Sequence, residues 1–240
     1  MRVAVLSDIH ANLPALDAVL AALAPFEAVW VLGDIVGYGP QPEAVIERLH
    51  AEHATGVLGN HDAAALGRIE TDAFNEDARV AVEWTAAHLG GTAREWLATL
   101  PERHVEGDFS MAHGSPRDPI WEYLFSTPVA RRNLSSFDTR HCLVGHTHVP
   151  LVFRDDDGLM ETLSPSDGSR LHLDARRTIL NPGGVGQPRD GDPRSCAMIL
   201  DPETGVAEWH RIAYDIPKVQ ALMRAEGLPE RLAQRLEFGL

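Results

Sequence analysis

Short apolar segments recur along the chain, and each is followed by a loop of small or polar residues. Consecutive apolar positions that are partly β-branched or aromatic are typical of strands buried on both faces of a layered α/β protein. We therefore predict strands at five places in the first part of the chain: Val3–Leu6, Ala28–Leu32, Gly56–Leu58, Phe109–Ala112 and Cys142–Val144.

The later part of the chain has a different pattern. The segment Val206–Ile212 places Ala207 and Trp209 on one side and Glu208 and His210 on the other. This alternation is typical of an antiparallel strand with one face in water. Further strands are predicted at Leu151–Arg154, Ser169–Leu173, Thr178–Leu180 and Ala197–Leu200.

Helical periods lie between the early strands. Asn12 is a favourable N-cap for a helix that carries Leu16, Val19 and Leu20, and Pro14 is tolerated in its first turn. Other helices are predicted from Pro42 to Leu49 and over Glu76–Leu89, Thr92–Leu100 and Pro128–Phe137. The order β-α-β-α-β, followed by a half rich in strands, predicts a layered α/β sandwich.

We expect residues 1–240 to form one domain, because the sequence contains no internal repeat, low-complexity tract or recognisable linker. The tail at about 217–240 is predicted to form one or two polar helices, broken at Gly227-Leu228-Pro229. This tail could either cover a sheet or mediate self-association, and the sequence does not distinguish these roles. The pattern indicates no oligomeric state.

The balance of charges restricts the partners. The chain has 21 Lys and Arg against 35 Asp and Glu, a formal net charge of −14. Such a surface repels polyphosphate backbones, so we expect no extended nucleic-acid binding. Two cysteines without a C-x-x-C motif suit a reducing compartment. No apolar run approaches the roughly 18 residues of a membrane span, and we expect a cytoplasmic protein with no membrane association.

Potential metal ligands directly follow the predicted strands. Because ligands in open α/β sheets bind beyond the carboxyl ends of strands, these loops can converge on one crevice. Two residues apart on extended chain, Asp8 and His10 point the same way and can hold one ion, as can His146 and His148. The candidate ligands are Asp8, His10, Asp34, Asn60, His113, His146 and His148.

The donor set contains carboxylates, imidazoles and one carboxamide, without thiolate. Such a mixture suits Mn, Fe or Zn better than Cu(I), an iron–sulfur cluster or Ca²⁺. Seven ligands exceed the needs of one tetrahedral ion, whereas two ions bridged by a carboxylate would use them all. Any one of these motifs alone could have only a structural role, but the presence of all five at strand ends indicates a metal site. The remaining histidines have no such context and are expected to be surface or strand residues: His50, His53, His88, His104, His141, His172 and His210.

The motifs D-x-H, G-D, G-N-H-D, H-G and G-H-T-H, in this order between Asp8 and His148, resemble those of the calcineurin-like metallophosphoesterase superfamily. The later loop Asn181–Gly191 is similar to the Asn-Pro-Gly-Ser-type loop of its small bacterial phosphodiesterase-like members, with Gly184 in place of the serine. The resemblance implies a four-layer αββα sandwich, in which two mixed β-sheets are flanked by helices.

By position in these motifs, the resemblance implies two divalent metal ions, of which Mn is the first expectation, with Fe, Zn or Ni as alternatives. Asp34 would bridge the ions, His61 would lie near the leaving-group oxygen, and Asp62 would orient His61. The remaining ligands would divide into one set for each ion, namely Asp8, His10 and His148 for the first and Asn60, His113 and His146 for the second.

Two bound ions would turn a bridging water into hydroxide, which attacks phosphorus in line while His61 protonates or stabilises the departing alkoxide. Arg189 could contact a substrate phosphate. The loops Asp72–Glu76 and Ser115–Thr127 could surround the pocket, and the aromatic residues of the second, Trp121, Tyr123 and Phe125, either stack on a flat group or pack in the core.

We therefore predict a metal-dependent phosphoesterase, and more specifically a phosphodiesterase, that hydrolyses a small phosphorylated substrate. A phosphomonoesterase or nucleotide pyrophosphatase would use the same centre, because the metals contact only the phosphoryl group. A catalytically silent binding or scaffold protein on the same fold is the alternative of another class.

Overall fold

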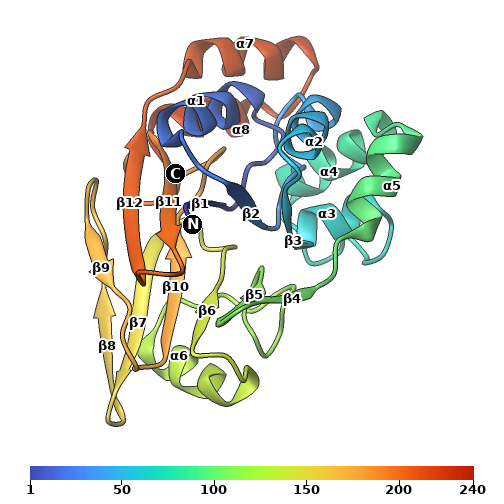
Figure 1. Ribbon diagram of the computed structural model, residues 1–240. Coiled ribbons are helices and arrows are strands. Elements are labelled where there is room, and N and C mark those ends of the chain that lie inside the picture. Colours follow the sequence, from blue (N-terminus) through green and yellow to red (C-terminus); the bar gives the residue numbers. More distant parts are fainter.

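In the computed structural model, which describes residues 1–240, two six-stranded sheets lie between helices (Figure 1). The first sheet has the order β3-β2-β1-β11-β12-β9, and the second has the order β4-β5-β6-β10-β7-β8. Both sheets are mixed, since each contains parallel and antiparallel pairs. The strands are β1 (Val3–Leu6), β2 (Ala28–Leu32), β3 (Thr55–Val57), β4 (Arg103–Glu106), β5 (Phe109–Ala112), β6 (His141–Leu143), β7 (Pro150–Asp156), β8 (Leu159–Leu163), β9 (Arg170–His172), β10 (Thr178–Pro182), β11 (Ser195–Asp201) and β12 (Val206–Ile212).

The alternation of side chains along β1 divides the core into layers. Ala4 and Leu6 face a cluster formed with helices α1, α2 and α5, whereas Val3 and Val5 face the second sheet. On the far side of that sheet, Ala130 of α6 packs in a separate cluster with residues of β6 and β7. This is the predicted four-layer αββα sandwich. The helices are α1 (Leu13–Leu23), α2 (Pro42–Ala51), α3 (Asn60–Ala65), α4 (Glu76–His88), α5 (Gly91–Thr99), α6 (Thr127–Asn133), α7 (Ile216–Ala225) and α8 (Glu230–Gln234).

Parallel pairing brings the chemically interesting loops to one edge. Strands β1, β2 and β3 run parallel to one another, as do β5 and β6 of the other sheet. The five motifs between Asp8 and His148 directly follow the carboxyl ends of these strands.

The C-terminal helices, coloured red in Figure 1, pack on α4 and on the loop after β2. Val219 and Met223 of α7 form a cluster with Tyr38 and with Ala78 of α4. Gln220 ties α7 to α8 by donating a hydrogen bond from Nε2 to the carbonyl of Ala233, at 3.0 Å. The tail thus supports Tyr38, which lies beside the candidate site described below.

Three elements are absent from the sequence-based prediction. Strands β4 and β8 lie at the two edges of the second sheet, where only one neighbour is present and the apolar pattern is weak. Helix α3 begins at Asn60, inside a motif that was interpreted as a loop of ligands. Strands β1, β2, β5 and β12 have the predicted boundaries. The remaining boundaries differ by at most four residues, the largest shift being at α6, which ends at Asn133 and continues as a 3-10 turn to Ser136.

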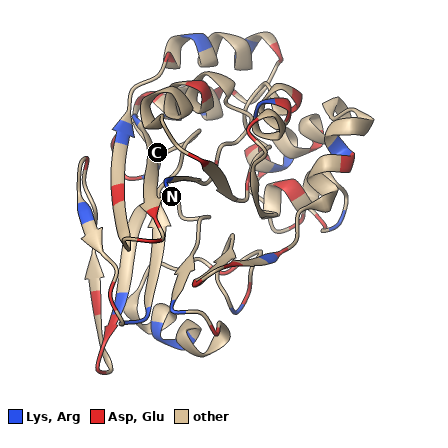
Figure 2. Cartoon of the chain, in the orientation of Figure 1, with Lys and Arg blue, Asp and Glu red and all other residues tan.

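Acidic and basic residues are interspersed over the outer helices and the edge strands (Figure 2). None of the helices combines the length and hydropathy that a bilayer crossing requires.

The stability of the α1 junction provides a first test. Asn12 caps α1 by accepting a hydrogen bond from the amide of Ala15, and its Nδ2 donates to the carbonyl of Gly186 at 2.9 Å. Replacing it by alanine removes a cap worth about 1 kcal/mol and leaves a buried carbonyl unpaired, at a cost of about 1–3 kcal/mol. We expect Asn12→Ala to lower the free energy of unfolding in urea by about 2–4 kcal/mol.

The matched control is Asn75→Ala, because Asn75 caps α4 in the same way but is exposed and makes no second hydrogen bond. It should lose only about 1 kcal/mol. Equal losses in the two variants would show that the bond to Gly186 contributes nothing.

Candidate metal centre

The structure brings all seven candidate ligands together at the strand ends. Asp8 and His10 follow β1, Asp34 follows β2, and His113 follows β5. Asn60 begins α3, and the pair His146 and His148 follows β6. None of these seven side chains is more than 4% exposed.

The backbone at these ligands is strained. Nine residues other than glycine have a positive φ, and five of them are candidate ligands, with φ between 49° and 65°: Asp8, His10, Asp34, His146 and His148. A left-handed conformation is uncommon for such residues and persists only where the surrounding structure imposes it. The loops therefore bend sharply to turn these side chains towards a common centre.

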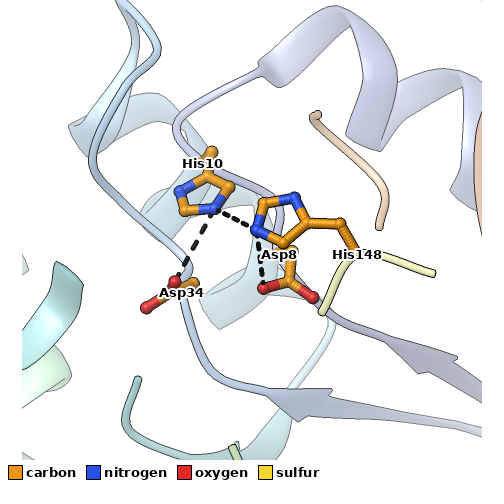
Figure 3. A group of neighbouring side chains, drawn as sticks. All are labelled: Asp8, His10, Asp34 and His148. Carbon is orange, nitrogen blue, oxygen red and sulfur yellow. Dashed lines mark hydrogen bonds and ion pairs between the residues drawn. The ribbon is translucent and has the colours of Figure 1, made fainter. Parts of the chain in front are cut away.

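Four of the side chains form a first group, in which the potential ligand atoms of Asp8, His10, Asp34 and His148 all lie within 4.8 Å of one another (Figure 3). Nε2 of His10 is 3.3 Å from Nε2 of His148. Nε2 of His148 is 3.3 Å from a carboxylate oxygen of Asp8, and Nε2 of His10 is 3.6 Å from one of Asp34.

Backbone carbonyls determine which ring nitrogens carry protons in this group. Nδ1 of His10 lies 3.1 Å from the carbonyl of Val36, and Nδ1 of His148 lies 2.5 Å from that of Gln187. A carbonyl only accepts, so each Nδ1 is the donor, and each neutral ring directs an Nε2 lone pair at the other. Two lone pairs at 3.3 Å repel each other, whereas a cation between them would be bound by both.

A second group consists of Asp34, His113 and His146. Nδ1 of His113 faces the carbonyl of Leu32 at 2.7 Å, which leaves Nε2 directed inwards. This Nε2 lies 3.0 Å from Nδ1 of His146, 3.1 Å from the amide oxygen of Asn60 and 3.3 Å from a carboxylate oxygen of Asp34. Asp34 belongs to both groups, as a bridging ligand would.

Burial keeps most of these groups in the form that binds metal. It lowers the pKa of His146 to about 2 and those of His10 and His148 well below the usual value, so the imidazoles are neutral. For His113 burial also favours the neutral form, but the Asp34 carboxylate outweighs it and raises the pKa to about 9.

Asp8 shows the clearest need for a cation. Both of its carboxylate oxygens are buried without a hydrogen-bond partner, and burial raises its pKa to about 7. A buried charged group without a partner is costly, and a bound divalent ion would satisfy both oxygens. The donor set and this unpartnered carboxylate fit metal ions.

Gly59 permits the close approach of Asp34. A methyl group at position 59 would lie 2.2 Å from the Oδ1 atom of Asp34 and 2.3 Å from its backbone nitrogen. Any side chain there would displace the shared carboxylate, which explains a glycine before Asn60.

His61 lies beside the first group without belonging to it. Its ring packs against Tyr38, His10 and Phe74, at centroid distances of 4.3, 4.9 and 4.8 Å. Burial lowers the pKa of His61 to about 4, so the ring is neutral at pH 7 and can donate one N–H.

The carboxylate of Asp62 contacts backbone amides. Instead of bonding to the His61 ring, its carboxylate accepts hydrogen bonds from the amides of Gly59, at 3.0 Å, and Val36, at 2.9 Å. It therefore fixes the first turn of α3 to the loop after β2. His61 is oriented by the aromatic rings around it, and Asp62 acts only through the backbone.

Arg189 extends towards the centre from the loop after β10. It donates hydrogen bonds to the side-chain oxygen of Gln187, the shorter at 2.8 Å, and its guanidinium lies 5.7 Å from the ring centroid of Tyr38. The side chain is partly buried and has no carboxylate within ion-pair distance, unlike most arginines in the chain. A cation in this position is free to meet an anion.

Sequence reasoning missed the residues that surround the ligands. Tyr38 packs on His10 and His61, Phe74 packs on His61, and Gln187 contacts both His148 and Arg189. The run Gly37-Tyr38-Gly39 was the available signal, because an aromatic residue between two glycines directly after a ligand loop has little reason to be core. The seven histidines expected to lie outside the centre belong to neither ligand group.

Comparisons with known proteins agree with this geometry. Residues 1–205 match the family described as the calcineurin-like phosphoesterase superfamily domain. The structure of a metallophosphoesterase from Sphaerobacter thermophilus is similar, with a TM-score of 0.92 and 46% identity, over 100% of this chain and 99% of that one.

Two curated proteins are similar in sequence. The protein MJ0912 of Methanocaldococcus jannaschii is 35% identical over 99% of this chain and 98% of its own. The phosphodiesterase YfcE of Escherichia coli is 28% identical over 83% of this chain and 87% of its own. With a family match over most of its length, the chain belongs to the calcineurin-like phosphoesterase superfamily and is a hydrolase of phosphate esters.

Proposed function

We propose that the protein is a phosphodiesterase with a dinuclear metal centre. Asp8, His10 and His148 hold one ion, Asn60, His113 and His146 hold the other, and Asp34 is shared. The observation that carries this proposal is the convergence of inward-facing ring nitrogens and carboxylate oxygens on two groups that have Asp34 in common.

Nitrogen and oxygen donors without thiolate favour Mn²⁺, with Fe, Zn or Ni as alternatives. When bound, two divalent ions would supply an activated water molecule and neutralise the oxygens of the phosphate. The protein's contribution is to hold the ligands at fixed positions and to exclude bulk water, because every ligand is buried.

The residues outside the two ligand groups act on the substrate. His61 donates its N–H to the oxygen of the departing alcohol, and the aromatic rings around it hold the imidazole in place. Arg189 binds a non-bridging phosphate oxygen, a role supported by the absence of a carboxylate partner.

Two findings support a small diester as the substrate. The curated relative YfcE is named a phosphodiesterase, and it is similar over most of both chains. The net charge of −14 and the interspersed charges of Figure 2 give no track for a polymeric polyanion.

Hydrolysis of bis-p-nitrophenyl phosphate tests the proposal. We expect the metal-stripped protein to be inactive and Mn²⁺ to restore turnover, with p-nitrophenyl phosphate hydrolysed more slowly than the diester. The rate should saturate at two equivalents of Mn²⁺, measured by elemental analysis of the desalted protein.

Faster turnover of the monoester would instead identify a phosphatase with the same centre. No turnover of either compound by protein with two bound ions would favour a binding role and contradict the proposal.

The role of His61 is tested by His61→Ala. Loss of a general acid or alkoxide-stabilising donor lowers turnover by about 10²–10⁴-fold, so we expect kcat on the diester to fall by at least about 100-fold. The Mn²⁺ content should remain at two equivalents, because His61 belongs to neither ligand group. His172→Ala, at an exposed histidine of β9, is the control and should match the wild type. Near-normal turnover in His61→Ala would refute the role.

The phosphate contact is tested at Arg189. A charge-assisted hydrogen bond contributes about 1.5–3 kcal/mol, so we expect Arg189→Ala to raise KM for the diester by about 10-fold or more. The KM of Arg189→Lys should lie between those of the wild type and Arg189→Ala, because lysine keeps the positive charge but lacks the planar guanidinium that forms two hydrogen bonds. Arg79→Ala, on the exposed face of α4, controls for loss of a positive charge. An unchanged KM in Arg189→Ala would remove the contact.

A further inference from the structure

Two aromatic rings lie exposed at the rim of the candidate centre. Tyr123 and Phe125 are 46% and 52% exposed, and both belong to the loop between β5 and α6. Their rings are nearly parallel, with centroids 5.7 Å apart and an interplanar angle of 7°. Large aromatic side chains are normally buried, and an exposed stacked pair beside an active site points to a ligand.

The pair is joined to the candidate ligands. On its inner side, the ring of Tyr123 stacks on that of His146, with centroids 3.8 Å apart and an interplanar angle of 21°. A continuous stack therefore runs from a candidate metal ligand through Tyr123 to Phe125 and the solvent.

The local sequence shows that the exposure is imposed by the fold. Leu124, between the two aromatics, is 1% exposed and packs in the cluster beneath α6 with Ala130 and Phe153. In an extended segment, neighbours of an inward residue point outwards. Leu124 thus anchors the loop while Tyr123 and Phe125 face the rim.

A second aromatic pair lies beside His61. Phe74 meets the ring of His61 edge-on, with centroids 4.8 Å apart, and Trp121 meets Phe74 at 5.4 Å. Both residues are partly buried. The exposed stacking face near the centre is therefore the one that Tyr123 and Phe125 present next to His146.

We propose that Tyr123 and Phe125 form a platform for a planar aromatic substituent of the substrate, the chemistry shared by nucleobases and simple aryl groups. This inference rests on the proposed function, because the phosphate at the metal centre brings the substituent to the platform. Stacking on one such ring strengthens binding of a base by about one order of magnitude, and it is independent of base identity because every base has a π-face.

Binding measured by isothermal titration calorimetry tests this platform without requiring turnover. Protein loaded with Mn²⁺ is titrated with AMP, with phenyl phosphate and with ribose 5-phosphate, which carries the phosphate and sugar but no ring. Hydrolysis of bis-p-nitrophenyl phosphate is followed with the same protein preparations. We expect the wild type to bind AMP and phenyl phosphate about 10-fold more tightly than ribose 5-phosphate.

Phe125→Ala should abolish this preference while leaving the affinity for ribose 5-phosphate within about twofold, since the predicted loss is confined to stacking. Phe125→Tyr should retain the preference, because the ring is kept. Leu159→Ala, at an exposed apolar residue of β8, is the control and should behave as the wild type. Phe125 is preferred to Tyr123 for the test because it touches no candidate ligand.

Two results would overturn the platform: equal affinities of the wild type for AMP, phenyl phosphate and ribose 5-phosphate, or a preference that survives in Phe125→Ala. Preference for AMP alone supports a platform that takes nucleobases, and preference for both aromatic esters supports one that takes any aryl group. A protein that shows the preference but does not hydrolyse bis-p-nitrophenyl phosphate would contradict the proposed phosphodiesterase and keep the platform.

Discussion

Hydrogen bonds from ring Nδ1 atoms to backbone carbonyls are the interactions on which the rest of the centre depends. Leu32, Val36 and Gln187 supply these carbonyls for His113, His10 and His148. Each fixes a ring position and places Nε2 towards the centre. In His10 and His148, which are neutral, it also fixes the tautomer and directs a lone pair inwards. Without a cation the resulting arrangement is unfavourable, since lone pairs and carboxylate oxygens face one another in a buried space. The folded protein without metal thus carries an unfavourable electrostatic free energy at these ligands, which binding of a cation would offset.

The elements around the centre fix the positions of the candidate ligands. Parallel strands deliver the loops to one edge, left-handed residues turn the ligands inwards, and Gly59 allows Asp34 to lie between the two groups. Asp62 locks α3 to the loop after β2, and the C-terminal helices pack behind Tyr38. A displacement in any of these elements would alter the distances between ligand atoms, which explains why a polar centre is supported by so much apolar packing.

Much of this could be predicted from the sequence, and the failures have physical causes. The layered sandwich and the convergence of the strand-end motifs follow from buried apolar runs and their order, which are local signals. The edge strands β4 and β8 were missed because a strand with one neighbour and exposed side chains has no apolar pattern. The contacts of Asp62 and the stack from His146 to Phe125 were not predictable in detail, because they join segments whose separation in space depends on the whole fold.

The proposed centre requires that the chain hold two ions that share Asp34. Anomalous diffraction from crystals grown with Mn²⁺, recorded at the manganese edge, would locate them. We expect two peaks about 3.5–4 Å apart, one between Asp8, His10 and His148 and the other between Asn60, His113 and His146, with Asp34 in contact with both. A single peak at full Mn²⁺ saturation, or a pair of peaks that does not share Asp34, would contradict the proposed centre.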